Sequence, residues 1–348
     1  MVLKVGYLKK TKVMKKKKIC LFMRKPMPDK NFSIENFYYE LFRDFKYKNF
    51  KIEFKVCPLK TQGILNRIFL CIWAYFNQGS INHICGDINF ISILMNKNKT
   101  INTFLDFYSM RRLKGLKKLI YYIFWIMIPF FKSRKVITIS NNTFNELKNL
   151  IKVRNKKDIH VIGVSISSGF KKKVKKKISN NPKILVVGTA INKNIINIIL
   201  SLKKVSCSLV LIGKLNDEII EKLLLNNINY ENLVSINERK LIGEYINCDI
   251  VLFPSNYEGF GMPILEAQSV GRPLITSKIE PMKSVAGDAA IFVNPKKINE
   301  ITRAVNLIIK NQRLRNSLIK KGFINIKRFK KEIILKQHLR VYSEITTS

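Results

Sequence analysis

The segment from residue 249 to residue 266 constrains the fold more than any other part of the chain. Its first half, Asp249-Ile-Val-Leu-Phe-Pro254, is a β-branched apolar run that ends at a proline, which is typical of a buried parallel strand. Its second half, Ser255-Asn-Tyr-Glu-Gly-Phe-Gly-Met-Pro-Ile-Leu-Glu266, places two glycines ahead of Pro263. Glycine lets a backbone pass close to a ligand, and proline suits the first position of a helix. The segment therefore predicts a strand, a glycine-rich loop and a helix.

Two carboxylates flank this glycine-rich loop. Glu258 follows the carboxyl end of the predicted strand, and Glu266 falls in the first turn of the predicted helix. Ligands of open α/β sheets bind at this end, where peptide amides and the helix dipole favour a phosphate. A purely structural alternative is that Glu266 only complements the helix dipole. The coincidence of two carboxylates, two glycines and a proline favours a ligand site.

Strand and helix patterns alternate along the rest of the chain, which predicts parallel sheets flanked by helices. The length of 348 residues exceeds one ordinary core and fits two domains. In the N-terminal half we expect strands at 18–23, 51–57, 81–85, 100–104 and 136–140, and helices at 33–45, 64–76, 88–95, 113–128 and 142–150. In the C-terminal half we expect strands at 183–187, 209–212, 233–236, 250–254, 273–277 and 290–293, and helices at 193–204, 215–227, 239–247, 263–271 and 297–311.

A basic segment interrupts this alternation near the middle of the chain. Residues 168–182 combine a run of lysines with glycine, asparagine and proline, a composition that is typical of a linker. The expected organisation is a basic arm at 1–17, an N-terminal Rossmann-like domain at 18–168, a linker at 169–182 and a C-terminal Rossmann-like domain at 183–325.

The segment 255–266 resembles the signature of glycosyltransferase family 4, whose members are retaining group 1 glycosyltransferases with two glutamates eight residues apart. The resemblance continues through Ala267-Gln-Ser-Val-Gly-Arg-Pro-Leu-Ile-Thr-Ser277 and Val285-Ala-Gly-Asp-Ala-Ala290, and more weakly over nearly the whole chain. It implies the α/β GT-B fold, in which two doubly wound domains face each other across a cleft and the last helix, here 326–348, crosses back onto the N-terminal domain. The implied activity is transfer of a hexose from a UDP- or GDP-sugar to a glycan acceptor.

The resemblance also implies roles for the residues around the loop. Glu266 would bind the ribose hydroxyls of the donor, because a carboxylate can accept two neighbouring hydroxyl hydrogens. Glu258 and the amides of Gly259, Phe260 and Gly261 would hold the transferred sugar and its phosphate. The acceptor would attack from the face of the leaving group, and the donor phosphate would take its proton.

Sugar transfer requires that the charge growing on the leaving diphosphate be stabilised by a metal or by protein cations and amides. The chain has no Asp-x-Asp pair, so we expect neither a divalent metal nor a cofactor. In Val187-Gly-Thr-Ala-Ile-Asn-Lys-Asn194, Gly188 and Thr189 follow a strand and Lys193 lies near the next helix. Taken alone, Lys193 would be a solvated surface group. In the resembled family a lysine at this position contacts the donor diphosphate.

Two positions of the chain depart from the family pattern. Thr189 stands where many members have an arginine, and Leu105, in Thr103-Phe-Leu-Asp106, stands where a histidine often faces the sugar. Asp106 is a candidate for the acceptor side, with helix capping as the alternative. His83 lies at a strand end, where histidines are more often structural, and we do not assign it as a base. These departures leave open a catalytically silent nucleotide-sugar-binding subunit.

The N-terminal glycine-rich loop of the family is also absent. Its place is taken by Arg24-Lys-Pro-Met-Pro-Asp-Lys-Asn31, which has prolines and cations. The phosphate of an acceptor could meet Arg24 or Lys25 there, and a solvated loop is the alternative.

The net charge of +41 is distributed unevenly along the chain. Residues 1–200 contain 41 Lys and Arg against 9 Asp and Glu, residues 201–300 contain 11 against 12, and residues 301–348 contain 12 against 2. This distribution favours a surface that is attracted to the anionic headgroups of a membrane. Nucleic acid would satisfy the same charge, but the chain has no aromatic-studded RNA motif or zinc finger, so we expect no nucleic-acid partner.

The longest apolar run, from Leu119 to Phe131, is flanked by lysines and arginines. Its composition fits a helix at a membrane interface and equally a helix of the core. It is shorter than the roughly 20 residues that span a bilayer, and the lysine-interrupted N-terminus does not match a secretory signal. Six scattered cysteines and three histidines suggest neither disulfides nor zinc. We therefore expect a cytoplasmic protein, held peripherally at the inner face of the cytoplasmic membrane. Together with this location, the family resemblance implies a lipid-linked acceptor in the biosynthesis of bacterial lipopolysaccharide, O-antigen or capsule.

Overall fold

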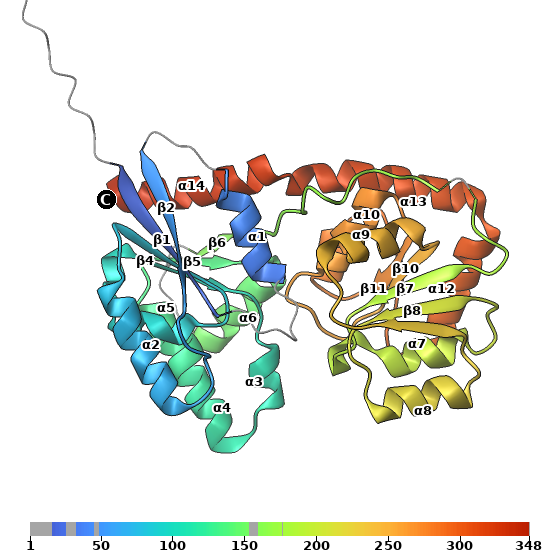
Figure 1. Ribbon diagram of the computed structural model, residues 1–348, viewed down its shortest axis with the longest axis horizontal. Coiled ribbons are helices and arrows are strands. Elements are labelled where there is room, and N and C mark those ends of the chain that lie inside the picture. The colour runs from blue at the N-terminus through green and yellow to red at the C-terminus, as the bar shows by residue number, and fades with distance from the viewer. Residues whose placement is uncertain (1–15, 26–32, 45–48, 153–158, 176, 348) are drawn as a thin grey trace, which may run out of the picture.

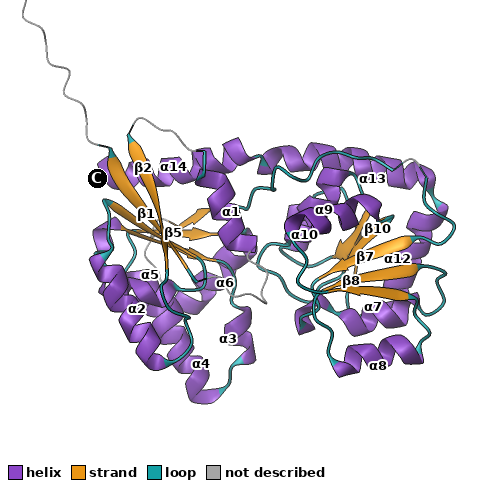
Figure 2. Ribbon diagram, in the orientation of Figure 1, coloured by secondary structure: helices purple, strands orange, loops and turns teal. Residues whose placement is uncertain are grey.

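The protein consists of two α/β domains, and a long C-terminal helix spans both of them (Figure 1). The structure is a computed structural model that describes residues 16–25, 33–44, 49–152, 159–175 and 177–347. Each domain contains one six-stranded parallel sheet with helices on both faces (Figure 2). The predicted α/β class with two doubly wound domains is therefore confirmed. Most of the expected basic arm, residues 1–15, lies outside the described residues.

The N-terminal sheet has the strand order β2-β1-β3-β4-β5-β6, and all of its pairs are parallel. Its central strands, β3 and β4, are buried along their whole length, as expected for a sheet covered on both faces, although about half of their residues are polar. The strands are β1 Lys17–Met23, β2 Phe50–Val56, β3 Ile81–Cys85, β4 Thr100–Phe104, β5 Lys135–Thr138 and β6 Ile159–Val161. The α-helices are α1 Ser33–Phe42, α2 Ile64–Phe76, α3 Tyr108–Arg112, α4 Gly115–Tyr121, α5 Ile128–Phe131 and α6 Asn141–Ile151.

Two helices of this domain differ from the prediction. The expected helix 88–95 is a 3₁₀ segment, η1 Asn89–Leu94, and the expected helix 113–128 is divided into α4, a π-helical segment η3 Tyr122–Met127 and α5. Pro129 accounts for the division, because proline cannot donate to the carbonyl four residues earlier and its ring crowds that carbonyl. The turn ahead of Pro129 therefore widens instead of continuing as an α-helix.

The C-terminal sheet has the strand order β12-β11-β10-β7-β8-β9. One expected strand, 233–236, is wrong by three residues, because Ser235 has a φ of +53°, which no extended strand accommodates. The strands are β7 Lys183–Val187, β8 Ser208–Ile212, β9 Tyr230–Leu233, β10 Ile250–Phe253, β11 Leu274–Ser277 and β12 Ile291–Val293. The α-helices are α7 Ile195–Leu202, α8 Asp217–Leu225, α9 Glu238–Asn247, α10 Met262–Val270, α11 Met282–Ala286, α12 Ile298–Lys310 and α13 Gln312–Asn325.

The last helix, α14 Lys331–Thr347, crosses from the C-terminal domain back onto the N-terminal domain (Figure 1), as the fold class predicted. It is fixed there by polar contacts. The Tyr342 hydroxyl lies 2.7 Å from Nδ1 of His83, and Lys135 lies 3.0 Å from Glu344. His83 is fully buried and its other ring nitrogen lies 2.7 Å from Thr103, so this histidine has a structural role.

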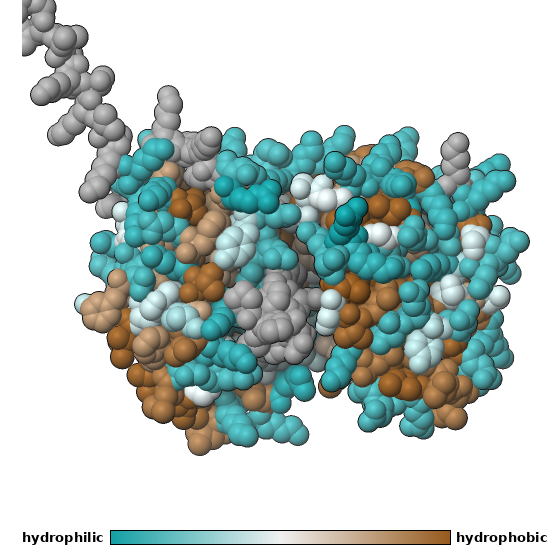
Figure 3. All heavy atoms as spheres, in the orientation of Figure 1, coloured by the Kyte–Doolittle hydropathy of each residue, from teal (hydrophilic) through white to brown (hydrophobic). Residues whose placement is uncertain are grey.

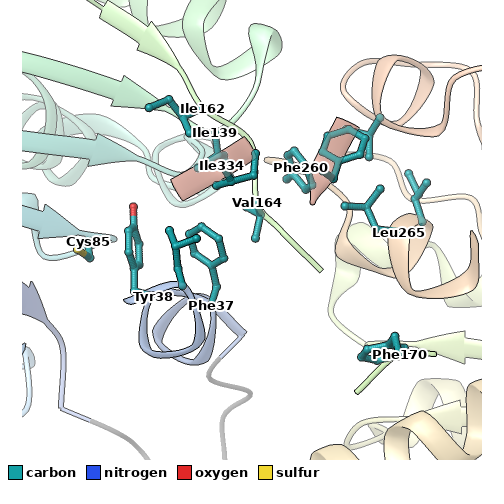
Figure 4. Close-up of a cluster of buried hydrophobic side chains, with 14 of the residues drawn as sticks. Phe37, Tyr38, Cys85, Ile139, Ile162, Val164, Phe170, Phe260, Leu265 and Ile334 are labelled. Atoms are coloured by element: carbon teal, nitrogen blue, oxygen red, sulfur yellow. The ribbon is translucent and has the colours of Figure 1, made fainter. Parts of the chain in front are cut away.

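One hydrophobic cluster is continuous across the two domains. Figure 4 shows its side chains converging from both sides, with Tyr38 and Ile139 from the N-terminal domain and Phe260 and Leu265 from the C-terminal domain. Val164, on the segment that leads away from β6, lies between them. The loop that carries Gly259 and Gly261 is thus anchored in the core through Phe260.

Candidate functional site

The strand order of the C-terminal sheet reverses between β7 and β10, so the loops that follow these two strands lie side by side. The carboxyl edge of an open sheet at such a reversal is the usual position of a ligand site. The loop after β7 contains Gly188, Thr189 and Lys193, and the loop after β10 contains Glu258 to Gly261. Both predicted groups of donor-binding residues therefore lie at one switch point.

Lys193 connects the two loops. Its Nζ lies 2.6 Å from Oε1 of Glu258, and both side chains are partly buried. Gly188 makes this reach feasible, since it has a φ of +89° and a Cβ at this position would lie 2.9 Å from Cε of Lys193. Asn192 supports the same loop by donating a 2.9 Å hydrogen bond to the carbonyl of Tyr257. The cation is held beside the glycine-rich loop by this local geometry.

The amides of Gly259, Phe260 and Gly261 form the second part of the site. Within the described part of the chain, none of these three N–H groups donates a hydrogen bond. Gly261, with a φ of +103°, is the N-cap of α10, so the open amides lie at the positive end of a nine-residue helix. Such a group of unpaired donors next to a lysine is suited to an anion. We call Lys193, Glu258 and the amides of residues 259–261 the Lys193 site.

Helix α10 begins one residue earlier than the sequence predicts. Pro263 is its second residue, and Glu266 lies in the second turn rather than the first. The side chain of Glu266 is nearly buried, with a relative exposure of 8% for the residue. A carboxylate so deep beyond the first turn does little for the helix dipole, which weakens the structural alternative for Glu266.

The environment of Glu266 favours a hydrogen-bonding role. The Tyr245 hydroxyl donates to Oε2 at 2.5 Å, and Oε1 has no hydrogen-bond partner among the described residues. Burial raises the pKa of Glu266 to about 7, although the Tyr245 hydrogen bond and the charge of Lys193 act to lower it. Near neutral pH the group is therefore divided between its neutral and charged forms.

Gly259 brings the loop against the N-terminal domain. A Cβ on Gly259 would lie 2.4 Å from the carbonyl oxygen of Leu105 and 2.9 Å from Cβ of Asp106. The close approach that requires a glycine here is an interdomain contact, whereas the sequence suggested a ligand. It places the departure from the family pattern at Leu105 directly beside the candidate site.

Asp106 accepts a 2.8 Å hydrogen bond from the amide of Tyr108, just before α3. Part of the carboxylate reaches solvent, yet the surrounding protein, and to a smaller extent the negative charge of Glu258, raise the pKa of Asp106. It therefore stands at the boundary of the two domains, next to the loop, while also fixing the start of α3.

Tyr257 joins the domains next to Glu258, and the sequence analysis missed it. Its hydroxyl accepts a 3.0 Å hydrogen bond from the amide of Phe107 and donates a 3.1 Å hydrogen bond to Glu146. The guanidinium of Arg111 lies 4.6 Å from the Tyr257 ring centre and 3.0 Å from Glu146. We call this group the Tyr257 clamp. The available signal was an aromatic residue directly before the glutamate of the loop.

The remaining predicted site residues have protein partners. The Thr189 hydroxyl donates to the carbonyl of Lys214 at 2.7 Å, which ties two loops together. Lys25 donates to the carbonyl of Pro58 at 2.9 Å. Arg24 lies 2.5 Å from Glu35 and 3.0 Å from Asp87, so two carboxylates already neutralise its charge. Arg24 and Lys25 follow β1 in the N-terminal domain.

No group of three or more His, Cys, Asp or Glu side chains suited to a metal ion occurs within the described ranges. Nor does any helix in those ranges have the length and apolar character needed to cross a membrane.

Residues 168–324 match the family model of glycosyl transferases group 1, and this segment contains the whole Lys193 site. Among characterised proteins, the chain is 32% identical over 91 residues to the O-antigen chain mannosyltransferase B of Escherichia coli. It is 26% identical over 101 residues to an N,N'-diacetylbacillosaminyl-diphospho-undecaprenol alpha-1,3-N-acetylgalactosaminyltransferase of Campylobacter jejuni. It is 25% identical over 237 residues to the O-antigen chain mannosyltransferase RfbU of Salmonella typhimurium. These matches cover 26%, 28% and 65% of this chain, and 24%, 27% and 65% of the relatives, which is less than two thirds of each.

Solved structures match over nearly the whole chain. The sucrose-phosphate synthase of Thermosynechococcus elongatus has a TM-score of 0.78 at 14% identity, covering 95% of this chain and 100% of that one. Anabaena Alr3699/HepE in complex with UDP and glucose has a TM-score of 0.74 at 14% identity, covering 94% and 100%. The architecture is that of the GT-B fold, and the sequence matches support a glycosyltransferase enzyme.

Proposed function

We propose that this protein is a retaining, metal-independent glycosyltransferase of family 4. It transfers a hexose from a UDP- or GDP-sugar to a lipid-linked glycan acceptor in the biosynthesis of a bacterial surface polysaccharide. The observation that carries the proposal is the Lys193 site. There a cation and three unpaired amides lie at the switch point of the domain that matches group 1 glycosyl transferases.

The donor diphosphate occupies the space between Lys193 and the amides of residues 259–261. As the bond to the sugar breaks, negative charge grows on the diphosphate, and these fixed donors stabilise it without reorganising. A single donor of this kind is worth about 10²–10³ in rate, so one cation and several amides are sufficient without a divalent ion. Lys193 exchanges its present partner, Glu258, for the phosphate oxygens, and Glu258 is released towards the transferred sugar.

Glu266 accepts hydrogen bonds from the two ribose hydroxyls of the donor. Its Oε2 is already oriented by Tyr245, which leaves Oε1 as the better acceptor for a hydroxyl. Lys193 and Glu266 lie close enough for the lysine charge to lower the pKa of the carboxyl group, which supports neighbouring positions for the ribose and the diphosphate. The N-terminal domain supplies the acceptor side, with Asp106 at the boundary.

The acceptor and the location of the protein rest on the relatives and on charge. One relative is named for an undecaprenol-linked acceptor and two for O-antigen chains. The basic N-terminal half suits an anionic membrane surface. We therefore place the enzyme in the cytoplasm, held peripherally at the inner face of the membrane where lipid-linked acceptors are extended.

Calorimetric titration with UDP and with GDP, each in the presence of EDTA and then of Mg²⁺, tests the donor site. We expect one nucleotide to bind equally well in both conditions. Incubation with a panel of nucleotide sugars and extracted lipid acceptors then tests transfer, and the anomeric configuration of the product tests retention. Absence of nucleotide binding would refute the donor site, and a strict need for Mg²⁺ would refute metal independence.

A catalytically silent subunit is the competing function, and Leu105 is the observation that favours it. Its backbone carbonyl meets Gly259 at the edge of the site, and its side chain has no group that could hydrogen-bond to a sugar as a histidine could. Nucleotide binding without turnover of any donor in the same assay would support the silent subunit.

A further inference from the structure

Helix α2 exposes a continuous apolar face. Two of its residues, Leu65 and Phe76, are 82% and 78% exposed, and a contiguous apolar patch on the surface of a protein commonly marks an interaction site. The exposed positions recur at intervals of one, three and four residues, which places them on one side of the helix. They are Ile64, Leu65, Ile68, Phe69, Ile72, Tyr75 and Phe76. The opposite side, with Leu70 and Ala74, packs into the core, so α2 is apolar on both sides.

The neighbouring segment α4–η3 extends this face. Leu116 and Leu119 of α4 are exposed, as is Phe124 of η3, while Ile126 and Phe130 farther along the same run are buried. The apolar run from Leu119 to Phe131 is therefore divided: its first part and Phe131 at its end are exposed, whereas Ile126 and Phe130 lie in the core. The guanidinium of Arg67 on α2 lies 4.7 Å from the ring centre of Trp125, which links the two segments. Figure 3 shows hydrophobic side chains gathered over α2 and α4 at the lower left.

The charges around this face are mostly positive. Asp87, whose backbone carbonyl accepts a hydrogen bond from Trp125, is an exception, and its carboxylate pairs with Arg24. No Asp or Glu occurs in residues 54–86 or in residues 107–145, which contain α2 and the whole α3–α5 region. Exposed cations lie at the edge of the apolar side chains, including Lys114, Lys117 and Lys118. A partner that covers this face must therefore combine an apolar interior with an anionic border.

We propose that the outer faces of α2 and α4 form a surface that inserts into the headgroup region of an anionic lipid bilayer. Apolar and aromatic side chains enter the boundary of the acyl chains, and the α4 lysines meet lipid phosphates. Helix α2 is about 20 Å long at 1.5 Å per residue, so it lies in the plane of the interface rather than across the membrane. The proposal that this surface binds lipid rests on the proposed function only for the identity of the membrane, the cytoplasmic membrane that carries the acceptor. Lipid binding itself does not require sugar transfer.

A second copy of the chain is a poorer occupant. Pairing two such faces would bring the cationic borders of both copies together without a carboxylate from either α2 or α4. An anionic bilayer provides the opposite charge and an apolar layer at once.

Vesicle flotation of the full-length protein tests the surface. The vesicles contain phosphatidylcholine alone or phosphatidylcholine with phosphatidylglycerol. We expect binding to the anionic vesicles only. The double variant Leu65→Gln/Phe76→Gln should reduce binding at least tenfold, whereas the matched variant Leu224→Gln/Leu225→Gln, on two residues of α8 that are 64% and 65% exposed, should bind like the unmodified protein.

The lysines of α4 are tested with a matched control pair as well. Lys117→Gln/Lys118→Gln should weaken binding about 30-fold, which corresponds to about 1 kcal/mol for each lysine near an anionic surface. Lys203→Gln/Lys204→Gln changes an adjacent exposed pair in the other domain and should have little effect. Thermal unfolding of each variant, followed by circular dichroism, confirms that the fold is retained.

Equal binding by the α2 variant and the unmodified protein would overturn the proposal, as would equal losses in the α8 control. Sedimentation of the same variants identifies self-association, because a dimer lost in the α2 variant with unchanged vesicle binding would assign this face to a second copy. UDP affinity is measured in parallel. Failure to bind UDP would refute the donor site while leaving the lipid result to stand alone.

Discussion

The two switch points of the molecule differ in what their charged groups contact. In the C-terminal domain, between β7 and β10, Lys193 meets Glu258 beside three unpaired amides. In the N-terminal domain, between β1 and β3, Arg24 is enclosed by Glu35 and Asp87. The topology offers both positions to a ligand. At the first, the cation has one carboxylate partner beside unpaired amides, whereas at the second two carboxylates neutralise the cation.

The outer surfaces of the domains also differ, in their charge and in their exposed apolar side chains. Residues 201–300 are almost neutral, and residues 1–200 carry most of the positive charge together with the exposed apolar face of α2. Similar layers of strands and helices thus support two different tasks. The interior determines the fold, whereas loop amides, cations and uncovered side chains determine what each domain can bind.

The largest expected effect is at the N-terminal switch point. Arg24→Met should lower the free energy of unfolding by about 3–5 kcal/mol, because it leaves the carboxylate of Glu35, whose side chain is 4% exposed, without its cation. Burial already raises the pKa of Glu35 with Arg24 present. Urea denaturation measures the change, and Lys25→Met is the control, with a loss below about 1 kcal/mol. A small loss in Arg24→Met would mean that this site tolerates an open charge and resembles the Lys193 site after all.

The next effect is on catalysis at the C-terminal switch point. Lys193→Met should reduce the rate of sugar transfer about 10²–10³-fold, because it removes the cation that stabilises the leaving diphosphate. Turnover with the best donor of the panel measures this, with Lys204→Met, on an exposed lysine of the same domain, as the control. A loss below tenfold would show that the amides of residues 259–261 suffice and that Lys193 only balances Glu258.

Glu266 gives a smaller effect, on donor affinity. Glu266→Gln should weaken UDP binding by about 1–3 kcal/mol, because the amide has one acceptor oxygen for the Tyr245 hydroxyl and the ribose hydroxyls together. Calorimetry measures the dissociation constant. An unchanged value would remove Glu266 from the donor site.

The same carboxyl group predicts a pH dependence. Since the pKa of Glu266 is about 7, UDP affinity should rise between about pH 6 and pH 8 as the better acceptor, the carboxylate, forms. Stability has the opposite sign. The folded pKa lies above the unfolded value of 4.5, so the contribution of Glu266 to the free energy of unfolding is largest at low pH and falls as pH rises from about 4.5 through 7. Both slopes should vanish in Glu266→Gln, and a slope that persists would belong to another group.

The sequence predicted those parts of the molecule that depend on local pattern. The strand–loop–helix segment at 250–270 and the helix of residues 64–76 follow from β-branched runs, glycines and apolar periodicity. Helix α13, Gln312–Asn325, was missed because its sequence is mostly polar and only Leu318 and Gly322 are buried. The periodicity of α2 could not show that most of its apolar residues face solvent, because that depends on which neighbours cover the helix.

The candidate site also has parts that the local sequence predicted and parts that depend on distant contacts. Glu258 and the three loop amides were predicted from adjacent residues, whereas the ion pair between Lys193 and Glu258 joins residues 65 positions apart. The contact of Gly259 with Leu105 and the Tyr257 clamp join two domains, and a single sequence contains no local signal for either. Packing between distant segments therefore decided the geometry that the motif alone left open.

The smallest effect tests whether the two switch points work together. Tyr257→Phe removes one hydrogen bond to the amide of Phe107 and one to Glu146, but Glu146 keeps Arg111 and Asn142 as partners. The loss of transition-state stabilisation should therefore stay near 0.5–1.5 kcal/mol. Because the clamp connects the acceptor side with the residue before Glu258, this loss should appear as a two- to tenfold lower kcat/KM for the acceptor. UDP affinity should change less than twofold.

Tyr108→Phe is the matched control for the clamp. Tyr108 stacks on Tyr257 at 5.6 Å between ring centres, and its hydroxyl makes no hydrogen bond within the described residues. Its removal should leave acceptor kinetics unchanged, since the ring contact remains. If Tyr257→Phe and Tyr108→Phe behave alike, the clamp contributes only aromatic packing, and the C-terminal loop is positioned by its own domain. If only Tyr257→Phe impairs transfer, the N-terminal domain helps to position Glu258 through two hydrogen bonds.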